Sequence, residues 1–261
     1  MDIKHFVSIK LESAKPEDIL LSEALASRLS LSPPSFSDDS TPFKFMFHES
    51  RLELHDNSAE TQSKGLFVDF LAGAAFYRFK TEKSIHHPLA KAVGIKKGVR
   101  PTICDATAGF GADSFVLAYL GCKVTMVERS PFIWALLDDG IRRALSNPEI
   151  KEIFRSLVSL HLAESTFFLK NTNNCFQTIY LDPMYPHRKK SALNKMRMRL
   201  LRSVVGDDED SARLLTTARK HALQRVVVKR PAGAPFIGQE KPSYAVVGKN
   251  SRYDVYLTNH L

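Results

Sequence analysis

The sequence predicts an α/β fold in which a mostly parallel sheet carries helices on both faces. Three observations favour this class. Short apolar or β-branched runs of strand length alternate with amphipathic runs of helix length from residue 99 onwards. A glycine-containing turn, residues 105–113, lies between the first of these strands and the helix that follows it. The last two strand-like runs are joined by residues 248–252, which predicts an antiparallel hairpin that closes the sheet.

Residues 1–63 are expected to form a small accessory α+β region, and residues 64–261 the main domain. Residues 16–31 have helical apolar spacing. Residues 43–47 and 51–55 alternate at period two and predict two strands joined by a turn at Glu49-Ser50. This region contains no recognisable catalytic set of residues, so we expect it to serve as an accessory domain or a cap.

The main domain can be followed element by element. Residues 64–80 place Phe67, Phe70 and Leu71 on one helical face, and Gly94 is expected to end a short helix. Ser130 and Pro131 are typical of a helix start, as N-cap and first helical residue. Further helices are expected at residues 114–120, 149–157 and 211–223, and strands at residues 99–104, 123–127, 159–162, 177–181, 225–229, 244–247 and 253–257.

The turn 105–113 is typical of a nucleotide-binding, Rossmann-like sheet. Gly109 and Gly111 carry no Cβ, so the backbone there can turn tightly and approach a ligand closely. Glu128, at the tip of the second strand, can accept hydrogen bonds from both hydroxyls of a ribose. Ligands of open α/β sheets bind beyond the carboxyl ends of the strands, which also places Asp105 and Asp182 at this crevice. A nicotinamide dehydrogenase and a methyltransferase using S-adenosyl-L-methionine (AdoMet) both begin with such a turn.

The end of the fourth strand favours the methyltransferase. There Asp182-Pro183-Met184-Tyr185 resembles the [Asn/Asp]-Pro-Pro-[Tyr/Phe] motif of enzymes that methylate exocyclic amino groups of bases. Such an amino nitrogen is a poor nucleophile, because its lone pair is delocalised into the ring. Asp182 and the carbonyl of Pro183 can accept its two hydrogens and aim the lone pair at the methyl carbon, while Tyr185 can stack on the base.

A cluster of cations follows this motif. Residues 188–202 hold seven of them and no acid, and the whole chain has a formal net charge of +9. We expect contacts with RNA phosphates, although a solvated helix face is the alternative. The residues predicted to bind RNA are Arg188, Lys189, Lys190 and Lys195.

Other classes of site are not expected. The three cysteines lack C-x-x-C spacing and His86-His87 has no third ligand at a suitable spacing, so no metal is predicted. No apolar run has the length of a signal peptide core or a membrane span. We therefore expect a cytoplasmic protein without membrane contact, and a monomer.

Several separate motifs, taken together, resemble the bacterial small-subunit ribosomal RNA methyltransferase J family. They are residues 65–70, 105–113, 127–129, 136–140, 180–187, 189–193 and 225–231. The resemblance implies a class I AdoMet-dependent methyltransferase fold and N2-methylation of one guanine of 16S ribosomal RNA, with S-adenosyl-L-homocysteine as the second product. Members usually carry arginine where this chain has Ala112, so only a backbone contact is expected there.

The turn and the resemblance together predict a set of residues around the cofactor. It comprises Asp105, Gly109, Gly111, Ala112, Asp113, Glu128, Arg129, Glu164, Ser165 and Asp182. Other functions stay open at this point. They are methylation of adenine N6 or of a protein glutamine, a nicotinamide dehydrogenase, and a non-catalytic RNA-binding protein.

Overall fold

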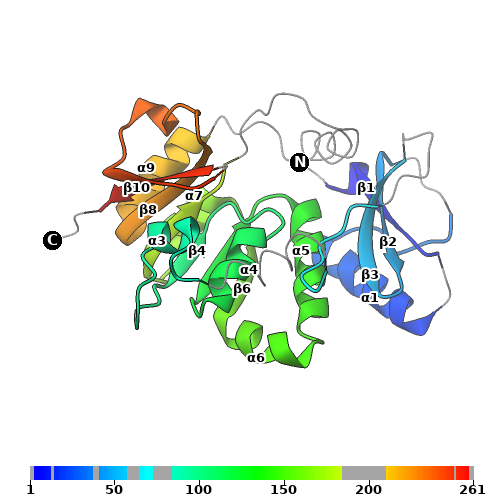
Figure 1. Cartoon of the computed structure of the whole chain (residues 1–261). Helices are drawn as coiled ribbons and strands as arrows, with labels where there is room; N and C mark the ends of the chain where they lie inside the picture. Colours follow the sequence, from blue (N-terminus) through cyan, green and yellow to red (C-terminus); the bar gives the residue numbers. More distant parts are fainter. Residues whose placement is uncertain are drawn as a thin grey trace.

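The computed structural model describes residues 3–12, 15–37, 41–57, 65–72, 84–183, 210–249 and 251–258. Its main body is a seven-stranded sheet with the strand order β6-β5-β4-β7-β8-β10-β9 (Figure 1). The strands are β4 (Ile103–Asp105), β5 (Val124–Glu128), β6 (Val158–Leu162), β7 (Phe176–Leu181), β8 (Ala222–Pro231), β9 (Tyr244–Val247) and β10 (Ser251–Leu257). Only β10 runs antiparallel to its neighbours, β8 and β9. The order reverses at β4, so the carboxyl ends of β4, β5 and β7 flank the switch point where such sheets bind ligands.

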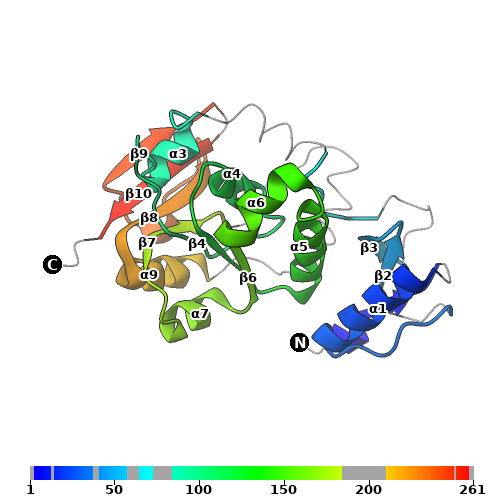
Figure 2. The same ribbon diagram turned by 90° about the horizontal axis from the view of Figure 1, so that it is seen from below.

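Helices cover both faces of this sheet, as Figure 2 shows for α4 and α6 on one side and α7 and α9 on the other. Side chains of consecutive β8 residues enter different hydrophobic clusters: Val227 packs in one, Val226 and Val228 in the other. This alternation is why β8 is apolar at every position from 226 to 228. The helices are α3 (Pro88–Val93), α4 (Ala112–Tyr119), α5 (Pro131–Ala144), α6 (Pro148–Leu157), α7 (Ser165–Asn171) and α9 (Ser211–His221), with a 3-10 turn η2 (Ile237–Gln239).

The N-terminal residues form a second, three-stranded sheet with the order β1-β2-β3. Strands β2 (Phe43–His48) and β3 (Arg51–Asp56) make the expected hairpin, turned at Glu49 and Ser50, whose φ angles are 50° and 60°. The expected helix is α1 (Pro16–Leu29). The sequence did not reveal β1 (Val7–Lys10), which pairs in parallel with β2, or the 3-10 turn η1 (Ile3–His5) before it, because both are too short to show a period.

This region packs against α5, at the end of the molecule opposite to the C-terminal hairpin (Figure 1). Phe43 and Phe45 of β2 contact Phe132 of α5, with ring centroids 6.1 and 6.2 Å apart. One hydrophobic cluster runs from these rings into the main body. The predicted domain boundary between residues 63 and 64 lies outside the described residues and stays a prediction.

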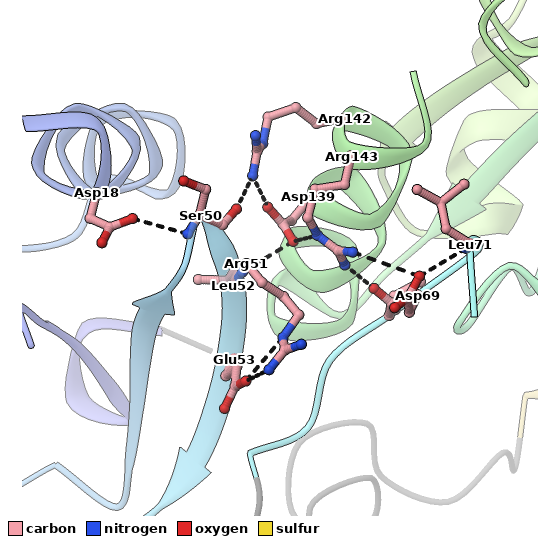
Figure 3. A network of polar contacts seen from close by, with 11 residues as sticks. Asp18, Ser50, Arg51, Leu52, Glu53, Asp69, Leu71, Asp139, Arg142 and Arg143 are labelled. Atoms are coloured by element: carbon pink, nitrogen blue, oxygen red, sulfur yellow. Dashed lines mark hydrogen bonds and ion pairs between the residues drawn. The ribbon is translucent and has the colours of Figure 1, made fainter. Parts of the chain in front are cut away.

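A buried carboxylate joins the two regions across this contact (Figure 3). Asp139 of α5 accepts a hydrogen bond from the backbone N–H of Leu52 at 3.1 Å, and it pairs with Arg142 at 2.6 Å and Arg143 at 2.9 Å. The guanidinium groups of Arg142 and Arg143 also donate hydrogen bonds to the carbonyls of Ser50 and Val68 respectively. Asp139 and its two arginine partners thus connect the β2–β3 hairpin and residues 65–72 to helix α5.

We expect Asp139→Ala to lower the free energy of unfolding by about 3 kcal/mol, because it leaves two partly buried cations and one buried N–H without their acceptor. The neighbouring Asp138→Ala is the matched control. Asp138 pairs with Arg28 at the surface, where both side chains are at least 32% exposed, so its loss should cost no more than about 1 kcal/mol. Urea denaturation of the two variants measures the difference, and equal costs would contradict the assigned role of Asp139.

Residues 65–72 differ from the sequence-based prediction, because they form no helix: apart from a bridge at Leu66 they are irregular, with bends at residues 70–72. Leu66 forms an isolated antiparallel bridge with Leu54 of β3. Phe70 is still buried, and its ring stacks on Phe115 with centroids 4.6 Å apart. Leu66, Val68 and Phe70 therefore do reach the core, but from an irregular segment and not from one face of a helix. Residues 73–80 lie outside the described part.

The remaining predicted elements of the main domain are found, with changed ends. The first strand begins at Ile103 and not at Val99. Gly94 ends α3 in the left-handed conformation, and Ser130 Oγ accepts the N–H of Ile133 at the start of α5. Helix α7 was not expected, since its seven residues are too few for a visible apolar period.

Candidate active site

A cavity of about 320 Å³ opens at the carboxyl ends of the parallel strands. This volume lies within the usual range for pockets that hold small organic ligands, about 300–1,000 Å³. The cavity brings together every residue that the sequence predicted around a cofactor, which are Asp105, Gly109, Gly111, Ala112, Asp113, Glu128, Arg129, Glu164, Ser165 and Asp182. Pro183, from the predicted base-binding motif, lines it as well. The chain also lines it with residues that sequence reasoning did not single out, among them Ile133, Asp210, Leu214 and Lys229.

The glycine turn forms one wall of the cavity. Gly109 and Gly111 have φ angles of 54° and 72°, in the left-handed region that favours glycine. Gly111 is also the N-cap of α4 and lies close to other residues: a Cβ there would meet Leu137 Cδ1 at 2.7 Å and Phe70 Cζ at 3.1 Å. At these two glycines the backbone itself therefore lines the cavity.

The carboxylate of Asp105 holds the glycine turn in place through two hydrogen bonds. Its Oδ1 accepts the N–H of Thr107 at 3.2 Å, and its Oδ2 accepts the hydroxyl of Ser114 at 2.6 Å. Burial raises the pKa of Asp105 to about 7; the two hydrogen bonds oppose this rise, and the nearby carboxylates of Asp113 and Asp182 add to it. Asp105 therefore changes its charge near neutral pH. Its hydrogen bonds connect the end of β4 to the glycine turn and to α4.

This pKa predicts a pH dependence of stability. An unfolded aspartate releases its proton near pH 4, whereas folded Asp105 keeps it up to about pH 7. Between these values the native state binds more protons, so its free energy of unfolding should fall by about 1.4 kcal/mol per pH unit as pH rises. Asp105→Asn removes this contribution, and the difference between the two proteins measures it in urea titrations at pH 5, 6, 7 and 8. A constant difference across that range would contradict the prediction.

Glu128, at the tip of β5, links the glycine turn to α5. Its Oε2 accepts the N–H of Gly109 at 2.9 Å and its Oε1 accepts the N–H of Ser130 at 2.7 Å. Burial raises the pKa of Glu128, against the effect of these hydrogen bonds. Each carboxylate oxygen has a second acceptor position, so the side chain can still accept ligand hydroxyls. Arg129, next to it, is exposed at the rim.

Glu164 and Ser165 reach the cavity through the start of α7. The carboxylate of Glu164 caps this helix, accepting the N–H groups of Thr166 at 2.9 Å and Phe167 at 2.7 Å. Partial burial would raise the pKa of Glu164, but these backbone hydrogen bonds outweigh it and the pKa is lowered. Ser165 donates its hydroxyl to the carbonyl of Ala106, just after β4. The unexpected helix α7 is therefore what holds both residues at the cavity.

A charged group that sequence reasoning missed lies at the centre of the site. Lys229, near the end of β8, places its Nζ 2.7 Å from Asp113 Oδ2 and 2.8 Å from Asp182 Oδ2. The hydroxyl of Tyr180 donates to the same Asp113 oxygen at 2.6 Å. The sequence did offer a signal for Lys229, since it is a cation that directly follows an apolar β-branched run at a strand tip.

The rest of the predicted site lies outside the described residues. This holds for Tyr185 and for the predicted RNA contacts Arg188, Lys189, Lys190 and Lys195. Across the described ranges, no group of three or more histidine, cysteine, aspartate and glutamate side chains is arranged to hold a metal ion. Nor does that part of the chain contain a helix long and apolar enough to cross a membrane.

Comparisons with known proteins agree with this geometry. A family model described as a putative SAM-dependent methyltransferase matches residues 24–258. A crystal structure of a SAM-dependent methyltransferase from Neisseria gonorrhoeae is 31% identical, with a TM-score of 0.73 over 97% of this chain and 96% of that one.

Curated relatives are more similar in sequence. The ribosomal RNA small subunit methyltransferase J of Desulfotalea psychrophila is 53% identical over 77% of this chain and 77% of its own length. The proteins of the same name from Shewanella denitrificans and Pseudomonas aeruginosa are 46% and 45% identical, and each alignment covers at least 84% of both chains. The chain described here thus belongs to the ribosomal RNA small subunit methyltransferase J family, within the SAM-dependent methyltransferases.

Proposed function

We propose that this chain transfers the methyl group of AdoMet to the exocyclic N2 of a guanine in 16S ribosomal RNA. AdoMet is the cofactor of its family. The observation that carries the choice of an amino group is the position of Asp182 and Pro183. They line the same cavity as the glycine turn and Glu128, so an amino group held at the tip of β7 would face a cofactor bound on that turn.

The cavity suits the proposed cofactor in size and in chemistry. When bound, AdoMet supplies an electrophilic methyl group on a sulfonium. We assign the ribose hydroxyls to Glu128, whose carboxylate lies at the tip of β5. Glu164 and Ser165 would lie beside the adenine, and the backbone of the glycine turn beside the amino-acid portion. Ala112, whose side chain has no polar group, can contribute only its backbone.

Asp182 and Pro183 would prepare the nucleophile. The Asp182 carboxylate and the Pro183 carbonyl accept the two N–H groups of the target amine, which draws the nitrogen lone pair out of conjugation with the ring. As the nitrogen takes the methyl carbon, the bond from that carbon to sulfur breaks, and the nitrogen is left with an extra proton that the Asp182 carboxylate would accept. Most of the rate would come from alignment of the amine with the methyl group.

Two further roles rest on the sequence alone. Tyr185 would stack on the target base, and a base taken from structured RNA has to leave its stack first. Arg188, Lys189, Lys190 and Lys195 would hold the surrounding phosphates. An rRNA substrate also places the proposed activity in the cytoplasm, and we propose that the enzyme acts there as a monomer.

The test identifies the methylated product. Purified protein is incubated with tritiated AdoMet and small ribosomal subunits, or 16S rRNA, that lack the modification, and the RNA is digested to nucleosides. We expect the label in N2-methylguanosine. Label in N6-methyladenosine, or in protein, would mean that the methyl acceptor is another amino group and not guanine N2. The absence of label from both RNA substrates would overturn the proposed function.

A further inference from the structure

We propose that Lys229 is a positioning residue, which holds the Asp182 carboxylate ionised and in a fixed orientation toward the target amine. This inference rests on the proposed function, because Asp182 is there the acceptor of the amino hydrogens. Lys229 itself would touch neither the methyl group nor the amine; it would act through Asp182.

The geometry supports a fixed orientation. The Lys229 ammonium bridges Asp182, at the tip of β7, and Asp113, in the first turn of α4, at 2.8 and 2.7 Å. Asp113 is buried and is held a second time by the hydroxyl of Tyr180. Asp113 therefore holds the ammonium in place, and the second bond of the ammonium restrains one oxygen of the Asp182 carboxylate. The side chain of Asp182 is 39% exposed. A long lysine chain without this anchor would be too mobile to restrain a partner.

Electrostatics supply the second reason. Three carboxylates, those of Asp105, Asp113 and Asp182, face one another at this end of the cavity, and Lys229 is the cation in direct contact with two of them. Burial would lower the pKa of Lys229, but Asp113 and Asp182 raise it well above its usual value, so Lys229 stays charged at neutral pH. Without its charge, mutual repulsion would favour protonation of a carboxylate. A protonated Asp182 could no longer accept both an amino hydrogen and the released proton.

The main chain of Asp182 is held in place as well. The N–H of Asp182 donates to the Thr107 hydroxyl at 2.6 Å, which fixes the main chain beside the glycine turn. Lys229 then takes Oδ2. With its main chain and Oδ2 both held, the Asp182 carboxylate keeps one orientation at the cavity.

A double-mutant cycle tests this role. We expect Lys229→Met to lower kcat roughly tenfold to a hundredfold, as a misplaced catalytic group does, and Lys229→Arg to restore part of the loss. In an Asp182→Asn background, Lys229→Met should cause no further loss, because the residue through which it acts is already neutral. Independent, multiplying losses would overturn the proposal, since they would mean that Lys229 acts on substrate or on the fold directly.

A second measurement does not depend on methyl transfer. Carboxyl carbons of ¹³C-labelled aspartates are titrated by NMR, and the Asp182 signal is assigned by its loss in Asp182→Asn. In the described structure, the titratable and charged groups that interact with Asp182 are Asp105 of β4, Tyr180 of β7 and Lys229 of β8, and Asp113 of α4 shares the ammonium with it. Glu128, Arg129, Glu164 and Asp210 line the same cavity. Removing the Lys229 charge in Lys229→Met should move the Asp182 titration upward by roughly one pH unit or more.

The two measurements separate the possible failures. If wild-type protein shows no methyl transfer to RNA but the titration moves as expected, the proposed function fails, and only the effect of Lys229 on the ionisation of Asp182 stands. If wild-type protein is active and the titration does not move, the positioning role fails alone. Lys229→Gln replaces Lys229→Met should the latter not fold, which thermal denaturation detects.

Discussion

Asp182→Ala is expected to lower kcat for methyl transfer by about a thousandfold, within the usual range of about 10²–10⁴ for the loss of a positioned acid or base. The substitution removes both an acceptor for the amino hydrogens and the base that would take the released proton. The effect should be local, because the hydrogen bond to the Thr107 hydroxyl comes from the backbone N–H of residue 182 and survives the change.

Binding and catalysis can be measured separately for this variant. Single-turnover transfer of labelled methyl to RNA gives the rate, and calorimetry gives the affinity for AdoMet, which we expect to change by less than about tenfold. Glu152→Ala, an exposed acid on α6 away from the cavity, is the control and should keep the wild-type rate. A rate for Asp182→Ala within fivefold of wild type would exclude Asp182 as the acceptor.

Gly111→Ala should have the second largest effect, on stability and on cofactor binding together. An alanine at φ 72° costs about 1–2 kcal/mol in backbone energy. Its Cβ would also lie 2.7 Å from Leu137 Cδ1 and 3.1 Å from Phe70 Cζ, in a core that has no room to relax freely. Overpacking of this kind adds about 1–3 kcal/mol, so a total loss of about 2–5 kcal/mol is expected.

Gly98→Ala is the matched control for this prediction. Gly98 has nearly the same backbone conformation, φ 74°, but a Cβ there would meet nothing within 4 Å. Gly98→Ala should therefore lower the free energy of unfolding only by the cost of the backbone conformation, and it should bind AdoMet as the wild type does. Urea denaturation and calorimetry on both variants separate the two contributions. Equal costs would mean that the contact with Leu137 and Phe70 does not constrain the turn.

Much of the fold could be predicted because local patterns and tertiary packing agree. The parallel strands are apolar runs bounded by turn residues, and α5 begins where Ser130-Pro131 predicts a helix start. The stretch 65–72 shows the opposite case. Its apolar spacing fits a helix, yet Leu66 gains a backbone partner in β3 and Phe70 gains a stacked ring, so long-range contacts decided the non-helical conformation.

The sequence by itself determined the α/β class, the glycine turn and the acids at the strand tips, because these depend on residue type and on order along the chain. Only the tertiary structure decided which of those acids share a cation and which residues tie the N-terminal sheet to α5. Lys229 lies 47 residues from Asp182 and 116 from Asp113, yet it contacts both. No period or spacing reports such a contact, because it exists only once β7, β8 and α4 have been brought together at one end of the sheet.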